Sequence, residues 1–254
     1  MSDVYQAPQS ELTEAIGSSE YGSIEKGING DYPFSIGDVL NEAWARTNGA
    51  KFKLNWACGL YFLVYLAVYL VSTFIIGALA LGGGDLASIA FGSLISGVLV
   101  AAVSTPPLVG VMVLGLNRSM DQPINPTAIF QHYQYIVPLL IAMVLMYIFL
   151  AIGFLLLIIP GIYLAVAYSF TLMLIVDKGL SPWQALETSR KAITKRWFTF
   201  FVYMLLIGLI NLIASIPLLI GLIWTVPMSI IAFGIIYRNM FGFGPESPSE
   251  TANG

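Results

Sequence analysis

Charged residues are scarce in this sequence. They make up only 10% of its 254 residues, whereas hydrophobic residues make up 57%. A soluble domain typically carries about 25% charged residues. No charged residue lies in the middle of any long apolar stretch. Because ionisable groups inside a membrane are costly and usually functional, this lack argues against a proton-coupled transporter. The composition predicts an integral membrane protein.

Histidine and cysteine are nearly absent. The only histidine is His132, expected to be solvated near the membrane surface, and the only cysteine is Cys58, which excludes a disulfide within the chain. An intramembrane metalloprotease needs histidine and acidic ligands, and a serine dyad needs a histidine base inside the membrane. No phosphate-binding glycine loop, zinc spacing or nucleophile elbow occurs. We therefore expect a non-enzymatic protein with no catalytic residue, no metal site and no cofactor.

Six apolar stretches account for most of the chain. Each is long enough to cross a hydrocarbon core of about 30 Å as a helix. Very short turns join them in pairs, which is typical of tight helical hairpins. The fold class expected is an all-α integral membrane protein of three hairpins, each preceded by a cytoplasmic interfacial helix. The six helices are placed near 55–80, 87–116, 136–158, 161–177, 197–217 and 220–240.

Basic residues are missing from one side of this topology. If the N-terminus is cytoplasmic, all eleven lysines and arginines fall in cytoplasmic segments, and the only charge in the three opposite turns is Asp85. Positive charge is retained on the cytoplasmic side during insertion. The sequence therefore predicts that both ends of the chain are cytoplasmic. A nucleic-acid partner is not expected, because no basic cluster combines with aromatic stacking residues on a soluble surface.

The polar segments divide the chain into a membrane domain and two tails. Residues 1–34 carry six acids against Lys26 alone and are expected to be a disordered cytoplasmic tail. Residues 242–254 are expected to be a loose C-terminal tail. The membrane domain, 35–241, begins each hairpin with a helix-capping residue, which is Ser35, Asn125 or Ser181. This pattern indicates repeat units of about 35–120, 125–178 and 181–241, although three unrelated segments with generic caps would look the same.

The segment 181–197 is the most structured polar element. As a helix it places tryptophans and aliphatic residues on one face and lysines on the opposite face. Arg190 lies inside the apolar arc, three residues after Glu187. It either pairs with Glu187 or binds, with the neighbouring lysines, the phosphate of an anionic lipid. The residues predicted to contact lipid head groups or the interface are Trp183, Arg190, Lys191, Lys195 and Trp197.

The second apolar stretch contains a line of small residues and a proline pair. Ser93, Gly97 and Ala101 recur every four residues, which lets another helix approach closely. They are predicted to form a packing seam, either inside the bundle or between copies of the chain. Pro106 and Pro107 are predicted to break the same helix, because proline lacks an N–H and clashes with the preceding turn. The freed carbonyls can line an ion or water site or be satisfied by neighbouring helices.

One block of the sequence resembles a known group of proteins. Pro160-Gly161-Ile162-Tyr163, then Asp177, then the run 181–190 (SPWQALETSR), are similar to a block of uncharacterised bacterial membrane proteins. These are the YciC-like proteins and relatives, which include the membrane region of some glycerophosphodiester phosphodiesterases. The resemblance implies a six-helix protein of the bacterial inner membrane and supplies no established activity. The phosphodiesterase catalytic domain has no counterpart here.

Together these features favour a scaffold or accessory subunit in the membrane. Its expected partners are membrane lipids, preferably anionic, and another membrane protein or further copies of itself in a homo-oligomer or larger complex. The alternative is a channel or transporter for a small apolar or weakly polar solute, with the proline-broken helices as its pathway.

Overall fold

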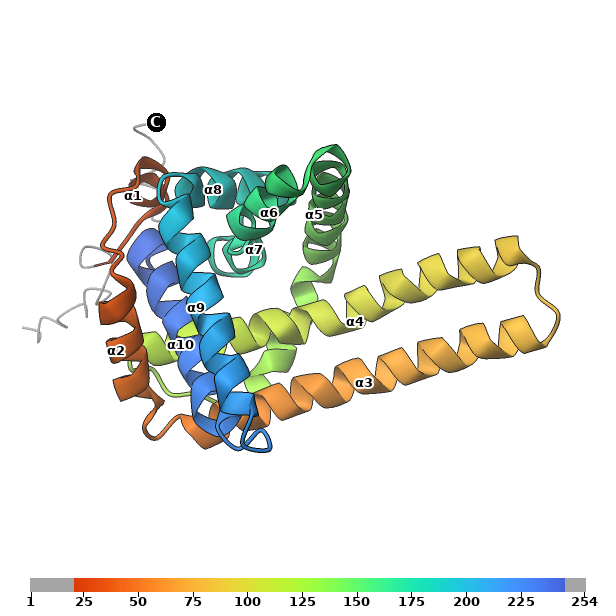
Figure 1. The fold of residues 1–254 in the computed structure, drawn as a ribbon, viewed down its shortest axis with the longest axis horizontal. Helices are drawn as coiled ribbons and strands as arrows, with labels where there is room; N and C mark the ends of the chain where they lie inside the picture. Colours follow the sequence, from red (N-terminus) through yellow and green to blue (C-terminus); the bar gives the residue numbers. More distant parts are fainter. Residues whose placement is uncertain (1–20, 245–254) are drawn as a thin grey trace, which may run out of the picture.

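The computed structural model describes residues 21–244, and every regular element in this range is helical (Figure 1). In chain order the elements are α1 (Ile24–Asn29), α2 (Ile36–Thr47), α3 (Lys51–Leu81), α4 (Leu86–Ser119), the 3-10 helix η1 (Pro126–Tyr135), α5 (Ile136–Leu156), α6 (Ile158–Ala167), α7 (Thr171–Lys178), α8 (Pro182–Thr194), α9 (Trp197–Ser215) and α10 (Leu222–Phe241).

Six helical stretches are long and apolar enough to cross a membrane, as the sequence predicted. The fourth stretch, Ile158–Lys178, is bent at Tyr168–Phe170, where α6 ends and α7 begins. The buried hydroxyl of Ser189 holds this bend, because it donates to the carbonyl of Ala167 (2.7 Å) and accepts from the N–H of Phe170 (3.2 Å). The chain thus has the all-helical character and the spans expected of a multi-pass membrane protein.

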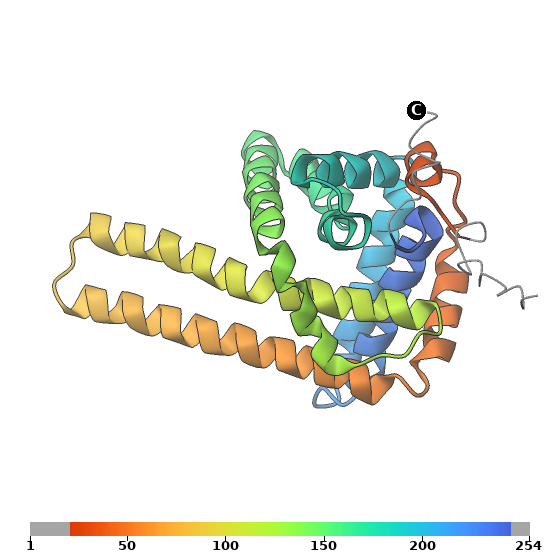
Figure 2. The same ribbon diagram turned by 180° about the vertical axis from the view of Figure 1, so that it is seen from behind.

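Helices α3 and α4 form a long antiparallel pair that projects from the rest of the protein (Figures 1 and 2). A turn closes the pair, with Gly83 at a φ of 85° and Asp85 capping α4 by accepting from the N–H of Ser88 (2.9 Å). Apolar side chains are exposed along this arm, including Phe74 (78%) and Leu94 (70%). An apolar surface of this extent needs a covering of lipid or protein.

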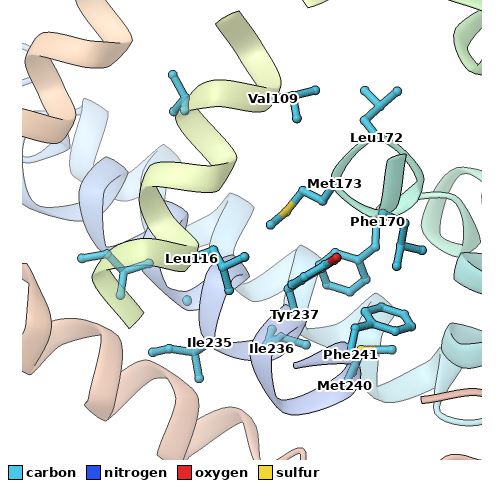
Figure 3. Close-up of a cluster of buried hydrophobic side chains, with 14 of the residues drawn as sticks. Val109, Leu116, Phe170, Leu172, Met173, Ile235, Ile236, Tyr237, Met240 and Phe241 are labelled. Atoms are coloured by element: carbon cyan, nitrogen blue, oxygen red, sulfur yellow. The ribbon is translucent and has the colours of Figure 1, made fainter. Parts of the chain in front are cut away.

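The remaining helices, together with the inner half of α4 and the start of α3, surround a core that is rich in aromatic residues (Figure 3). Phe170, at the bend between α6 and α7, lies at its centre. Its ring is 4.5 Å from that of Phe233 and 5.6 Å from that of Tyr237, measured between centroids. Phe200 of α9 packs edge-on against it at 5.4 Å. Aromatic pairs at these distances stabilise a core beyond their area burial.

Helix α10 crosses the inner half of α4 at two glycines. A Cβ atom on Gly234 would lie 2.5 Å from the carbonyl carbon of Gly115, and one on Gly115 would collide with the backbone of Ile230. Because neither position has room for a side chain, the two backbones approach more closely than larger residues would allow.

The two ends of the described chain meet beside α10. The N–H of Gly22 donates to the carbonyl of Arg238 (3.2 Å). The Arg238 side chain is buried and pairs with Glu42 of α2 at 3.1 and 3.2 Å, while its guanidinium also donates to the carbonyl of Ser119. One arginine therefore ties α2, α4 and α10 together.

Part of the predicted N-terminal tail is folded. Residues 21–34 contain α1, and Tyr32 and Phe34 insert into the core with 3% and 9% of their surface exposed. The Tyr32 hydroxyl donates to the carbonyl of Ala192 (3.2 Å), and burial raises its pKa to about 12 despite the nearby Arg196. The other residues of the predicted tails, 1–20 and 245–254, lie outside the described residues.

The predicted helix caps are present. Ser35 accepts from the N–H of Asp38 (3.4 Å), and Asn125 accepts from that of Thr127 (3.1 Å). Ser181 and Gln184 form a complete capping box. The second capped segment differs from the expected α-helix, because η1 is a 3-10 helix that continues directly into α5.

The helix pairs cross one another instead of lying parallel. In Figure 1 the α3–α4 arm crosses α9 and α10 at a steep angle. Asn55, near the start of α3, donates to the carbonyl of Ile223, near the start of α10 (2.8 Å). The predicted topology places these residues on opposite sides of the membrane. The structure therefore does not confirm the predicted arrangement of three membrane hairpins.

Candidate functional site

Helix α8 carries Trp183, Arg190 and Lys191 of the five predicted lipid-contact residues, whereas Lys195 is its C-cap and Trp197 begins α9. The burial pattern of α8 shows which of its sides faces outward. Ala185, Ser189 and Ala192 are completely buried against the body of the protein, as is Ile193. The lysines at 191 and 195 lie on the exposed side. Short buried residues let α8 pack closely, and the longer basic side chains are left free to reach a charged partner.

Arg190 pairs with Glu187 through two hydrogen bonds. Its Nη2 lies 2.8 Å from Oε2 of Glu187, and its Nε lies 3.3 Å from Oε1. The hydrogen bonds from Arg190 lower the pKa of the Glu187 carboxyl, with a further contribution from Lys191 at 3.8 Å. They likewise raise the pKa of Arg190. This geometry fits the first of the two interpretations of Arg190, the pairing with Glu187.

A small open cavity of about 290 Å³ lies between α1 and α8. Arg190, Lys191, Thr194 and Lys195 line it from α8, and the segment Ile28–Asn29 lines it from α1. Three of the lining residues are cations, and Glu187 pairs with two of them, Arg190 and Lys191, so the cavity carries an excess of positive charge. It can bind a phosphate group through Lys191 and Lys195 while Arg190 keeps its partner. We call this cavity the α1–α8 basic pocket.

The two predicted tryptophans lie outside the α1–α8 basic pocket. Trp183 is 54% exposed, with its ring 6.1 Å from that of Phe149. Trp197 is half-buried, because its Nε1 donates to the carbonyl of Tyr163 (3.2 Å) and its ring stacks on Phe201 at 5.2 Å. Trp183 thus remains open to the surroundings, whereas Trp197 packs α9 against α6.

Ser93, Gly97 and Ala101 lie together in a groove of about 600 Å³ between α3, α4 and α5. Tyr61 and Tyr65 also line it from α3. Apart from the neighbouring residues and backbone of α4 itself, no atom of the described chain, 21–244, lies within 4 Å of a Cβ built on Gly97. The predicted seam is therefore not filled by another helix within this part of the chain. We call it the α3–α4–α5 groove.

The proline pair does not break its helix, contrary to the prediction. Helix α4 continues from Leu86 to Ser119 with Pro106 and Pro107 buried inside it. Pro107 leaves the carbonyl of Val103 without its usual N–H partner. The hydroxyl of Tyr133 donates to this carbonyl at 2.8 Å and replaces the lost hydrogen bond. Neighbouring η1 thus satisfies at least one of the carbonyls that the prolines free.

Three features of the site region could not be predicted from the sequence. The ion pair of Arg238 with Glu42 had no sequence signal beyond the equal spacing of Arg118 and Arg238 from their prolines. Ser104 has a buried hydroxyl without a partner among the described residues, and no pattern marked it. His132, expected to be solvated, has a buried Nδ1 and lies against the backbone of Ile129.

Comparison with known proteins gives no relative. No protein-family model, curated protein or solved structure matches this chain. Within residues 21–244, no group of three histidine, cysteine, aspartate or glutamate side chains is placed to hold a metal ion. The resemblance to YciC-like proteins stays a prediction.

Proposed function

We propose that this protein is a non-enzymatic scaffold or accessory subunit of the bacterial inner membrane. In this proposal the α3–α4 arm binds another membrane protein or further copies of the chain, and α8 contacts anionic lipid. The observation that carries the proposal is the arm itself, a long helix pair with exposed apolar side chains along it.

The shape of the arm supports a binding role. Its outer part lies away from the body, so its apolar surface is available to a partner (Figure 2). Inside a membrane, helices associate through close packing of small residues rather than through burial of apolar area. Helix α4 also carries small exposed residues outside the α3–α4–α5 groove, including Ala87 and Ala90. These residues fit a surface that another helix can approach.

The charge of α8 supports the lipid contact. Lys191 and Lys195 are exposed in the α1–α8 basic pocket, and Trp183 is exposed nearby on the same helix. Anionic head groups attract such residues by about 1 kcal/mol per lysine near the surface. We further propose that α2 and α8 are the interfacial helices of a repeated unit, which the caps at Ser35 and Ser181 support.

The proposed orientation has both ends of the chain in the cytoplasm. The basic residues outside the start of α3 support it, whereas Lys51 lies beside Trp224 at the end of α10 that the same rule places on the opposite side. The hydrogen bond between Gly22 and Arg238 also supports it, because it brings the first and last described segments to the same place.

The channel alternative rested on a predicted helix break at the proline pair, and α4 has no such break. It required a broken helix with free carbonyls, whereas α4 is continuous and Tyr133 occupies the carbonyl of Val103. No other feature of the described residues favours it over the scaffold.

A cross-linking experiment tests the arm. A photoreactive amino acid is placed at Phe74 or Phe91 on the arm, both outside the lining of the α3–α4–α5 groove, and at Phe198 on α9 as a control of similar exposure (72%). We expect the two arm positions, and not the control, to cross-link to one protein in fixed stoichiometry in the native membrane. Cross-links to lipid alone at all three positions would contradict the scaffold.

A lipid-retention experiment tests α8 separately. The double variant Lys191→Gln/Lys195→Gln is compared with Lys53→Gln, which removes an exposed lysine near the start of α3. Both are placed in nanodiscs of mixed phosphatidylglycerol and phosphatidylethanolamine and released for native mass spectrometry. We expect the double variant to retain about tenfold less phosphatidylglycerol, since two lysines contribute about 2 kcal/mol at most. Equal retention by the double variant and the wild type would contradict the lipid contact.

A further inference from the structure

The α3–α4–α5 groove has the size of a ligand site. Its volume of about 600 Å³ falls within the range of about 300–1,000 Å³ that small-molecule pockets occupy. The small residues Ser93, Gly97 and Ala101 form one side, and Met143 and Tyr147 of α5 form another. Gly97 leaves the space open, because nothing in the described chain lies within 4 Å of a Cβ at that position.

The inner end of the groove contains an unpaired polar group. Ser104 lines the groove with only 6% of its surface exposed, and its hydroxyl has no hydrogen-bond partner in the described chain. The adjacent Thr105 hydroxyl, in contrast, donates to the carbonyl of Ala101 (2.7 Å). A buried hydroxyl left without a partner costs about 1–3 kcal/mol. A ligand atom that accepts or donates a hydrogen bond would remove this cost.

Further hydroxyl groups lie along the same groove. Tyr61, Tyr65 and Tyr147 line it, and the ring centroids of Tyr61 and Tyr65 lie 6.3 Å apart. None of the residues that line the groove is an acid, a lysine, an arginine or a histidine. A charged ligand would therefore enter without a counter-ion, which is costly in an apolar site. The lining instead suits an apolar ligand with uncharged polar atoms.

We propose that the α3–α4–α5 groove binds a neutral lipid, a molecule with a hydrocarbon chain and an uncharged hydroxyl or carbonyl group. The chain lies against the small residues of α4, and the polar group reaches Ser104 or the tyrosine hydroxyls. A partner helix fits less well, because an apolar helix face offers no hydrogen-bond partner to the buried hydroxyl of Ser104. This site goes beyond the scaffold role and requires no partner protein.

Photolabelling tests the site in the full-length protein in nanodiscs. The probe is an 18-carbon alcohol with a diazirine in the middle of its chain, and the competitors are octadecan-1-ol and octadecane. We expect the label on Tyr61, Tyr65, Met143 or Tyr147. We also expect octadecan-1-ol to halve labelling at about one fifth of the octadecane concentration, because only the alcohol can bond to the hydroxyl groups.

Three variants locate the ligand. Gly97→Leu fills the groove and should lower labelling at least tenfold. Gly208→Leu is its matched control, because Gly208 is also an exposed helical glycine with nothing within 4 Å of its Cβ, and it should label like the wild type. Ser104→Ala should reduce the fivefold difference between the two competitors to less than twofold.

Each contrary outcome overturns the proposal. Equal competition by octadecane would mean ordinary hydrocarbon contact only. Unchanged labelling of Gly97→Leu would place the probe elsewhere, and cross-links between two copies of the chain in place of labelled lipid would mean that a helix fills the groove. If Gly97→Leu does not fold, Ser104→Ala decides, and an unchanged competitor difference in that variant overturns the proposal.

Discussion

The side-chain amide of Asn55 donates a hydrogen bond of 2.8 Å to the backbone carbonyl of Ile223, and so joins the start of α3 to the start of α10. The ammonium group of Lys51 reinforces this junction, because it lies 5.4 Å from the ring centroid of Trp224. Two segments in direct contact cannot lie on opposite sides of a hydrocarbon core of about 30 Å. The contact therefore has a direct consequence for membrane topology.

We expect Lys53→Cys and Leu219→Cys to react from the same side of the membrane. Both positions are exposed and flank the junction, and each variant is made after Cys58→Ala removes the native thiol. Labelling with a membrane-impermeant maleimide in sealed, oriented vesicles measures the side. Lys195→Cys serves as the reference, because α9 separates it from residue 219.

Lys195→Cys also shows which side each position lies on if Lys53→Cys and Leu219→Cys react from different sides. In the topology predicted from the basic residues, Lys53→Cys would react together with Lys195→Cys, and Leu219→Cys would react from the other side. That pattern would show that the Asn55–Ile223 contact does not exist in the membrane.

The sequence was sufficient to predict the helices but not how they cross. Apolar length and charge distribution act along the chain, so they identified six spans and the caps at Ser35, Asn125 and Ser181. The crossing of α4 and α10 depends on two glycines 119 positions apart, Gly115 and Gly234. Such a pair has no local pattern, because glycine also occurs in turns and on open helix faces.

The glycine crossing gives a stability prediction. We expect Gly234→Ala to destabilise the protein by about 3 kcal/mol, because its Cβ would lie 2.5 Å from the carbonyl carbon of Gly115 and the helices must move apart. Thermal unfolding in detergent, followed by circular dichroism, measures the change.

Gly208→Ala is the matched control for this prediction. Gly208 lies in α9 with nothing in the described chain within 4 Å of its Cβ, so alanine should be neutral or stabilise by up to about 1 kcal/mol. Equal melting temperatures for the two variants would contradict a close crossing at Gly234.

The proline pair shows why the predicted break of α4 did not occur. Proline in a helix leaves a carbonyl unpaired, and the sequence could not show where a replacement donor lies. Tyr133 supplies it for Val103 from a segment 30 positions away. The same limit applies to the candidate site: the spacing of Ser93, Gly97 and Ala101 predicted a close approach, but only the fold shows that their face is open.

Tyr133→Phe tests this compensation. Removing the hydroxyl leaves the Val103 carbonyl without a partner in α4, at a cost of about 1–3 kcal/mol. We expect a lower melting temperature than for Tyr69→Phe, which removes an exposed hydroxyl on the arm and should change stability by less than about 0.5 kcal/mol. If both variants melt like the wild type, the hydroxyl of Tyr133 does not stabilise α4.

The pairing of Glu187 with Arg190 predicts a pH dependence of stability. The hydrogen bonds from Arg190 lower the pKa of Glu187 below its ordinary value of 4.5, and Lys191 adds to the effect. The folded state thus holds this proton less tightly than the unfolded chain. The contribution of the pair is fully present above the ordinary pKa and is lost as the pH falls through the lowered value.

Glu187→Gln isolates this contribution, because glutamine keeps the shape of the side chain but has no charge to lose. We expect the wild type to melt at a higher temperature than Glu187→Gln between pH 7 and the ordinary pKa of 4.5, and the difference to shrink at lower pH. Melting curves at a series of pH values and low salt measure it, since salt screens a pair that is about one-third exposed. A difference that stays constant down to pH values well below 4.5 would mean that Arg190 does not stabilise the ionised carboxylate.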